Sequence, residues 1–233
     1  MADIDGTLNE GGDEVIPEVT QTVLKLEAKG ILVGLVSGRT GPMLQKMAGL
    51  LDINGPLIAE NGAIARLSPT STPLELGYSK QPAATALAKL KHLYPGRITE
   101  RWDNSERLVD IVFQAEGVPI EELRRQLPDV QVLDSRYIMH LMQKGISKGQ
   151  TLLNILPKVE SNIGVDEVIV AGDSATDLSL FENFPRSVLV RNPRIPPEES
   201  IMLQKAACYI SEHEQGYGFA EVAAFILDLL QGL

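Results

Sequence analysis

The N-terminal stretch MADIDGTLNE carries two carboxylates, Asp3 and Asp5, which are spaced by one residue and followed by Gly6. In an extended segment this spacing places both side chains on the same side of the chain. Carboxylates are the side chains of cation-binding and acid–base sites, although the motif alone fits an acidic surface turn equally well. A calcium-binding loop is disfavoured, because its sixth position counted from Asp3 requires glycine and is Leu8 here.

Other polar side chains follow strands that are predicted elsewhere in the chain. Each cluster alone has a structural explanation, such as a helix cap or a solvated acid in a first helical turn. In a doubly wound sheet, however, ligands bind beyond the carboxyl ends of the strands, so the clusters together mark one rim. The strands and the polar residues after them are ILVGLV with Ser37, Gly38 and Arg39; PLIA with Glu60, Asn61 and Gly62; EVIVAG with Asp173 and Asp177; and SVLVR with Asn192.

Helices and strands are predicted to alternate at both ends of the chain. The helix over 17–29 begins with proline, is followed by glycine and carries its apolar residues on one face. The continuous apolar run 31–36 indicates a strand buried on both faces of a parallel sheet. The alternation predicts a doubly wound α/β core. The remaining predicted elements are helices over 41–51, 147–156, 175–183, 196–206 and 218–230 and strands over 56–60, 167–172, 187–192 and 208–210.

The middle of the chain follows a different order: helix, strand, strand, repeated once. This order predicts a small α+β module inserted into the core. The predicted domains are a core made of 1–74 and 146–233 and an inserted module of 75–145. The elements expected in the module are helices over 81–94 and 119–127 and strands over 97–102, 107–114, 130–135 and 137–142.

The composition limits the classes of partner. A net charge of −10 without a basic stripe argues against nucleic acid, and no apolar run is long enough to span a membrane. The single Cys208 excludes a disulfide framework within the chain and suits a reducing compartment. One cysteine and three scattered histidines cannot form the usual zinc clusters. We therefore expect a cytoplasmic protein, either a monomer or a homodimer.

Taken together and in this order, DIDGTL, LVSGR, SKG and GDSATD resemble the four motifs of the haloacid dehalogenase superfamily of phosphatases. The resemblance covers residues 3–62 and 147–193 and implies a Rossmann-like α/β core. The inserted module resembles the cap called type C2, in the small version of archaeal phosphoglycolate phosphatases and sucrose-phosphate phosphatases. AENGA and VRNP also resemble flanking motifs of that branch. The substrate-binding residues that follow are Gly38, Arg39, Glu60, Asn61, Gly62 and Asn192.

The resemblance implies an aspartyl-phosphate mechanism. Asp3 would be the nucleophile that attacks phosphorus, and Asp5 would protonate the leaving oxygen and later accept a proton from water. Ser37 would hydrogen-bond the phosphoryl group. Lys148 would neutralise the charge of that group and of the nucleophile. Asp3, Asp5, Ser37 and Lys148 are therefore the expected catalytic residues.

The implied cofactor is Mg²⁺, which prefers oxygen ligands and retains part of its water shell. Its expected ligands are Asp3, the backbone carbonyl of Asp5, and Asp173. Asp177 would order the metal shell, either directly or through water. The branch commonly has asparagine before this last aspartate, whereas this chain has Thr176, which can still hydrogen-bond.

The resemblance also implies several apolar residues before the first aspartate, which form the central strand of the sheet. Only Met1 and Ala2 stand there. Without that strand, the facing edges of 31–36 and 167–172 would lack backbone partners, at about 1–3 kcal/mol for each buried group. We expect either that residues upstream of this sequence are missing or that a shortened strand uses residues 1–4.

The cap is expected to select the leaving group of a small phosphorylated substrate, either a sugar phosphate or a phosphoglycolate-like acid. Two alternatives remain: a phosphotransferase or mutase of the same superfamily, and a degenerate member that binds a phosphorylated metabolite without catalysis.

Trp102 is expected to pack within the cap, and His140 is expected to be structural. The candidate anion contacts of the cap are Arg101, Arg107, Arg136 and Lys144.

Overall fold

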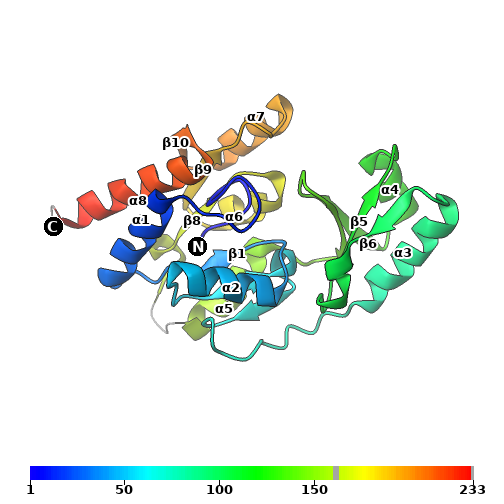
Figure 1. Ribbon diagram of the computed structural model, residues 1–233, viewed down its shortest axis with the longest axis horizontal. Coiled ribbons are helices and arrows are strands. Elements are labelled where there is room, and N and C mark those ends of the chain that lie inside the picture. The colour runs from blue at the N-terminus through cyan, green and yellow to red at the C-terminus, as the bar shows by residue number, and fades with distance from the viewer. Residues whose placement is uncertain (160–162, 232–233) are drawn as a thin grey trace.

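The structure, a computed structural model, describes residues 1–159 and 163–231 of the chain. Figure 1 shows two bodies, a larger one built from both ends of the chain and a smaller one, mostly green, built from its middle. The N-terminus lies inside the larger body, whereas the last helix, α8 (Gln215–Gln231), runs along its outside. No helix in the described residues is long and apolar enough to cross a membrane.

The larger body contains a central sheet in two halves. In the first half, β1 (Leu35–Val36) pairs parallel with β2 (Leu57–Ala59), and β2 pairs antiparallel with the edge strand β3 (Ile64–Arg66). The parallel pairing is as predicted, whereas β3 is an element that was not predicted from the sequence. The strands of the second half, all parallel, are β8 (Ile169–Gly172), β9 (Arg186–Arg191) and β10 (Tyr209–Glu214).

The first three residues join the two halves of the sheet. Ala2 forms parallel bridges to both Leu35 and Ala171. Its amide donates to Gly34 O at 3.0 Å, and its carbonyl accepts from Val36 N at 2.9 Å. On the other side, the amide of Asp3 donates to Ala171 O at 2.9 Å. A short strand segment around Ala2 therefore gives both facing edges backbone partners.

Most of the predicted strand 31–36 does not pair as a strand, and only its last two residues form β1. The amide of Val33 donates instead to Glu27 Oε1 at 2.9 Å, and the carbonyl of Val33 accepts from Gly55 N at 2.9 Å. These contacts use the backbone groups that a neighbouring strand would need. The run nevertheless ends in β1, so Ser37 lies directly after the carboxyl end of that strand.

Alternate residues of the strands face opposite sides of the sheet, as the period of two requires. Leu35 and Leu57 pack into one hydrophobic cluster, and Val36 and Ile58 pack into another. Helices cover both faces, which confirms the predicted doubly wound α/β core. They are α1 (Pro17–Ala28), α2 (Gly41–Leu51) and α8 on the first face and α5 (Lys148–Val159), α6 (Leu178–Asn183) and α7 (Pro197–Ala206) on the second.

The smaller body, called the cap below, is an antiparallel sheet of four strands in the order β4-β5-β7-β6, with two helices. Its elements repeat the predicted order helix, strand, strand, and it has a hydrophobic cluster of its own. The domain boundaries at 74/75 and 145/146 stay predictions. The elements are α3 (Gln81–Leu93), β4 (Ile98–Glu100), β5 (Ile111–Ala115), α4 (Ile120–Gln126), β6 (Val130–Asp134) and β7 (Met139–Gln143).

Two cap strands, β4 and β5, are each three residues shorter than the sequence predicts, because of contacts made by neighbouring residues. The first ends at Glu100, because Trp102–Ser105 form a 3₁₀ turn. The second begins only at Ile111, because the amides of residues 108–110 donate to the carboxylate of Glu60 in the core. The second strand is thus shortened by a contact between the cap and the core.

Candidate active site

The carboxyl ends of the parallel strands face the cap across a cavity of about 780 Å³. Core residues from several separate segments line it, among them Asp3, Ser37 and Lys148. The cap contributes Arg101 and His140 to the opposite wall. Part of the predicted rim is therefore one wall of a cavity that also has a wall from the cap, whereas Asp173 and Asn192 line a neighbouring pocket.

Asp3 and Lys148 form the centre of the core wall. Both side chains are buried, and Lys148 Nζ lies 3.1 Å from Asp3 Oδ1 and 2.7 Å from Asp177 Oδ1. Lys148 also donates to Thr176 Oγ1 at 3.2 Å. Burial lowers the pKa of Lys148, but the charges of Asp177 and Asp3 outweigh it and raise that pKa above its ordinary value. The lysine is therefore a fixed positive charge beside the predicted nucleophile.

Three buried carboxylates, those of Asp3, Asp173 and Asp177, offer oxygen atoms that lie within 4.8 Å of one another. Burial and the charge of Asp177 raise the pKa of Asp173 to about 7, and burial with the same charge raises the pKa of Asp3 well above its ordinary value. A divalent cation among these oxygens would offset the repulsion, and hard oxygen donors suit Mg²⁺. The residues present therefore fit a magnesium site.

Hydrogen bonds orient the carboxylates of this cluster. Thr7 Oγ1 donates to Asp173 Oδ1 at 3.0 Å, and Asn192 Nδ2 donates to Asp173 Oδ2 at 2.7 Å. The amides of Asp173 and Ser174 both donate to Asp177 Oδ2 at 3.1 Å. Asn192, which we predicted to bind substrate, thus contacts the predicted metal ligand Asp173.

The carboxylate of Asp5 lies outside this cluster, because it is bound by Arg39. Arg39 Nε donates to Asp5 Oδ2 at 2.8 Å, and Arg39 Nη2 donates to Asp5 Oδ1 at 2.6 Å. The same guanidinium reaches Asp13 Oδ1 at 3.1 Å. Because Arg39 binds both carboxylate oxygens of Asp5, only the backbone carbonyl of this residue is left as the predicted metal ligand.

The loop Glu60–Gly62 is a 3₁₀ turn in which all three residues have positive φ angles. A Cβ atom on Gly62 would lie 2.5 Å from Ser147 O, so glycine is needed where the loop meets the start of α5. Asn61 is buried at the cavity wall, and its Nδ2 has no hydrogen-bond partner among the described residues. Glu60 does not offer its carboxylate to the cavity, since backbone amides of the cap occupy both oxygens.

The predicted cap residues divide into two groups. Arg101 lines the cavity, with Nε 3.2 Å from Asp103 Oδ1. Arg136 pairs instead with Glu199 at the start of α7, which ties the cap to the core. Trp102 is 69% exposed at the cavity rim, so the prediction that it packs within the cap is wrong.

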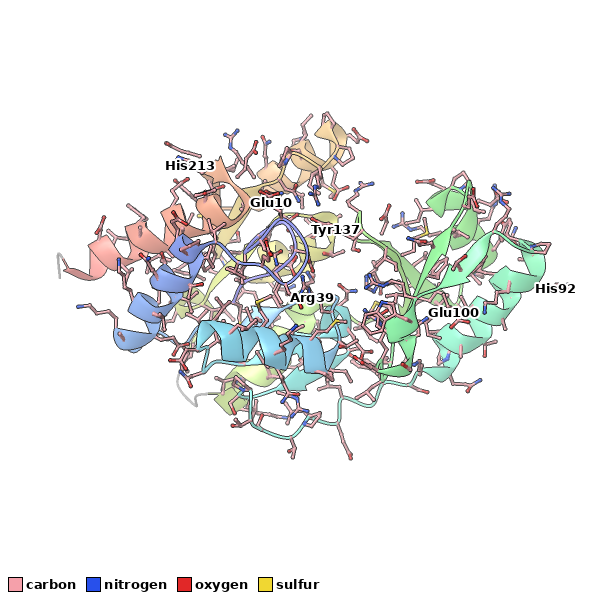
Figure 2. All side chains as sticks on the ribbon, in the orientation of Figure 1. Glu10, Arg39, His92, Glu100, Tyr137 and His213 are labelled. Atoms are coloured by element: carbon pink, nitrogen blue, oxygen red, sulfur yellow. The ribbon has the colours of Figure 1, made fainter. Side chains whose placement is uncertain are left out.

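Further residues at the mouth of the cavity were not predicted. Arg194 Nη1 donates to Glu10 O at 2.8 Å, and its guanidinium lies 5.6 Å from the centre of the Tyr137 ring. Figure 2 shows Tyr137 of the cap pointing toward the core loop that carries Glu10, with Arg39 facing the same region. Arg194 follows the VRNP motif directly, and that position was the available signal in the sequence.

The sequence profile of the haloacid dehalogenase-like hydrolases matches residues 1–94 and 88–221, which together are most of the chain. The chain belongs to this family. A phosphoglycolate phosphatase of Methanospirillum hungatei is 30% identical over 226 residues, covering 95% of this chain and 93% of its own length. The prediction of an enzyme of the phosphatase kind is thereby confirmed.

Solved structures agree with this family assignment. A crystal structure from Thermoplasma acidophilum superposes with a TM-score of 0.80 at 22% identity, covering 95% of this chain and 94% of its own. The sucrose-phosphatase of Synechocystis, in complex with sucrose and phosphate, superposes with a TM-score of 0.74 at 17% identity, covering 96% and 95%. At these identities the likeness establishes the fold alone.

Proposed function

We propose that this haloacid dehalogenase-like hydrolase is a Mg²⁺-dependent phosphatase that releases phosphate from a small phosphorylated hydroxy acid of the phosphoglycolate class. The observation that carries the proposal is the contact of Asp3 with Lys148 beside Asp173 and Asp177, at the floor of a cavity that the cap covers. The relative from Methanospirillum hungatei, named a phosphoglycolate phosphatase, supports the substrate class.

In the proposed first half-reaction, a carboxylate oxygen of Asp3 forms a bond to phosphorus while the bond from phosphorus to the leaving oxygen breaks. Lys148 holds the phosphoryl charge, and Ser37, which is 2% exposed on the same wall, hydrogen-bonds a phosphoryl oxygen. When bound at Asp3 and Asp173, Mg²⁺ supplies further positive charge at the phosphoryl group. The product of this half-reaction is an aspartyl-phosphate.

Asp5 is the proposed acid and base. It gives a proton to the leaving oxygen in the first half-reaction and takes one from water in the second, in which water attacks phosphorus and frees Asp3. Its carboxylate lines the cavity near Asp3, and Arg39 fixes its orientation through two hydrogen bonds. Orientation matters here, since proton transfer requires hydrogen-bond reach to the reacting oxygen.

The test is phosphate release from phosphoglycolate, sucrose phosphate and other phosphorylated metabolites in the presence of Mg²⁺, with Asp3→Asn as the control variant. We expect release from phosphoglycolate that EDTA and Asp3→Asn both abolish. Release that survives in Asp3→Asn would contradict the mechanism. Transfer of phosphate to a second sugar phosphate without net release would favour the mutase alternative, and binding without turnover would favour a non-catalytic member.

A further inference from the structure

A buried chain of charged residues runs through the cap and ends at His140 on the cavity wall. His140 Nδ1 lies 2.7 Å from Asp110 Oδ2, and Asp110 Oδ1 accepts from Arg107 Nη1 at 2.7 Å. Arg107 also donates to Asp103 Oδ2 at 2.9 Å and to Gly38 O, in the core, at 2.9 Å. These contacts fix the imidazole on the cavity wall relative to the loop that follows β1.

The hydrogen bond to Asp110 determines which ring nitrogen of His140 can meet a ligand. Although burial raises the pKa of Asp110, the hydrogen bonds and charges of His140 and Arg107 hold that pKa below its ordinary value. The ionised carboxylate accepts a hydrogen bond, so Nδ1 carries the proton and Nε2 is the nitrogen left for the cavity. When the ring is protonated, Nε2 donates as well.

Asn61 provides a second group at the same place. A Cβ atom on Gly38 would lie 3.0 Å from His140 Cε1 and 3.1 Å from Asn61 Nδ2, so the two side chains converge on the space above this glycine. Asn61 is 3% exposed, and its Nδ2 lacks an acceptor among the described residues. A buried donor of this kind calls for an acceptor atom from a ligand.

We propose that His140 and Asn61 form the subsite that holds the carboxylate of the leaving group. A carboxylate offers only acceptor oxygens, so it can accept from the amide of Asn61 and, when the ring of His140 carries both protons, from Nε2 as well. Arg101 on the same wall adds positive charge. This inference rests on the proposed function and changes the role expected for His140 from structural to specificity-determining, with Asp110 and Arg107 as its positioning residues.

The first test compares two substrates that differ only in the carboxylate, phosphoglycolate and ethyl phosphate, by the ratio of their kcat/KM values. In His140→Asn the side-chain amide can replace Nδ1 toward Asp110 but cannot replace Nε2, whereas Gln in His140→Gln places its amide near Nε2. We expect the ratio to fall about tenfold to hundredfold in His140→Asn and less in His140→Gln. A wild-type ratio in His140→Asn would overturn the proposal.

The control variant is His92→Gln, because His92 lies on the exposed face of α3 at the far end of the cap (Figure 2) and should leave the ratio unchanged. The proposed function fails if the wild-type protein releases phosphate from neither substrate. This inference fails separately, if the wild-type protein is active but its variants keep the wild-type ratio.

The second test needs neither turnover nor a variant. The chain has three histidines, so the imidazole ¹⁵N resonances of the wild-type protein are few enough to assign. We expect 3-phosphonopropionate, a non-hydrolysable carboxylate analogue, to shift the Nε2 resonance of His140 and to leave those of His92 and His213 in place. Ethylphosphonate, which lacks the carboxylate, should shift it less. Equal shifts with both ligands, or no shift with either, would overturn the proposal.

Discussion

Arg39 holds Asp5 by two parallel hydrogen bonds, from Nε to Oδ2 at 2.8 Å and from Nη2 to Oδ1 at 2.6 Å. Such a fork fixes the plane of the carboxylate as well as its position. Both residues follow strand ends that meet at the same rim, one after the first residues and one after β1. The proposed acid and base is therefore oriented by a side chain of the second motif.

Arg39→Lys should weaken catalysis, because a lysine keeps the charge but loses the two-point contact that orients Asp5. We expect kcat/KM for phosphoglycolate to fall about tenfold to hundredfold, in line with a misplaced acid–base group. Steady-state phosphate release measures this. The control is Lys91→Gln, which removes an exposed ion pair with Glu100 on the cap and should leave kcat/KM unchanged. A wild-type rate in Arg39→Lys would contradict the orienting role.

Glu60→Gln should destabilise the protein, because the carboxylate accepts three backbone amides of the cap, those of Leu108, Val109 and Asp110, at 2.8, 2.8 and 2.9 Å. An amide group has one oxygen, so at least one buried N–H would face an NH₂ donor. We expect a loss of about 1–3 kcal/mol in the free energy of unfolding. Urea denaturation measures it.

The matched control for this variant is Glu116→Gln, an exposed position at the end of β5 whose side chain makes no hydrogen bond among the described residues. It should change the free energy of unfolding by less than about 0.5 kcal/mol. Equal stability of the two variants would show that the Glu60 contacts do not stabilise the junction between cap and core.

The metal-free protein should lose stability as the pH rises, because Asp173 has a pKa of about 7 in the folded state against 3.8 ordinarily. Between these values Asp173 holds a proton in the folded protein that it has lost in the unfolded chain, so this group lowers the free energy of unfolding by about 1.4 kcal/mol per pH unit. Below pH 3.8 both states are protonated, and above pH 7 the loss is complete. Unfolding in EDTA across this range measures the slope.

Two comparisons test the cause of this slope. Asp173→Asn should make the slope shallower by about 1.4 kcal/mol per pH unit, and the raised pKa of Asp3 keeps its own contribution. Asp129→Asn, at an exposed position of the cap, should leave the slope unchanged. Added Mg²⁺ should raise the melting temperature more at pH 8 than at pH 5, since metal binding requires deprotonated carboxylates. A slope that Asp173→Asn leaves unchanged would contradict the assignment.

The rim of polar residues could be predicted from the sequence because each group follows a strand end, and the carboxyl ends of parallel strands share one edge of the sheet. Ser37 and Asp173 are therefore placed by the alternation of helices and strands, whereas Asp3, which has only Met1 and Ala2 before it, was placed by the resemblance of its motif. The order helix, strand, strand likewise predicts the cap, because strands that follow each other closely pair antiparallel. These are features that local patterns determine.

What could not be predicted depends on contacts between distant segments. Nothing near Glu60 in the sequence indicates that its carboxylate accepts amides of residues 108–110, and that contact also shortens the predicted strand. The Asp110–His140 pair is similar, since it joins neighbouring strands of the cap. His140 alternates with apolar residues, so a structural role was the natural interpretation of its position in the sequence.

Two helical glycines should respond in opposite ways to alanine. A Cβ atom on Gly149, next to Lys148 at the start of α5, would lie 1.9 Å from Ser179 O in α6, whereas a Cβ atom on Gly49 in α2 would meet nothing within 4 Å. Gly149→Ala must therefore push the two helices apart and move Lys148 away from Asp3. We expect a loss of about 1–3 kcal/mol in the free energy of unfolding, together with a lower kcat.

Gly49→Ala should raise the free energy of unfolding by about 0.5–1 kcal/mol, through lower backbone entropy of the unfolded chain, at unchanged kcat. Denaturation and phosphate release measured on both variants decide the matter, and a destabilising Gly49→Ala or a neutral Gly149→Ala would contradict the packing of these helices.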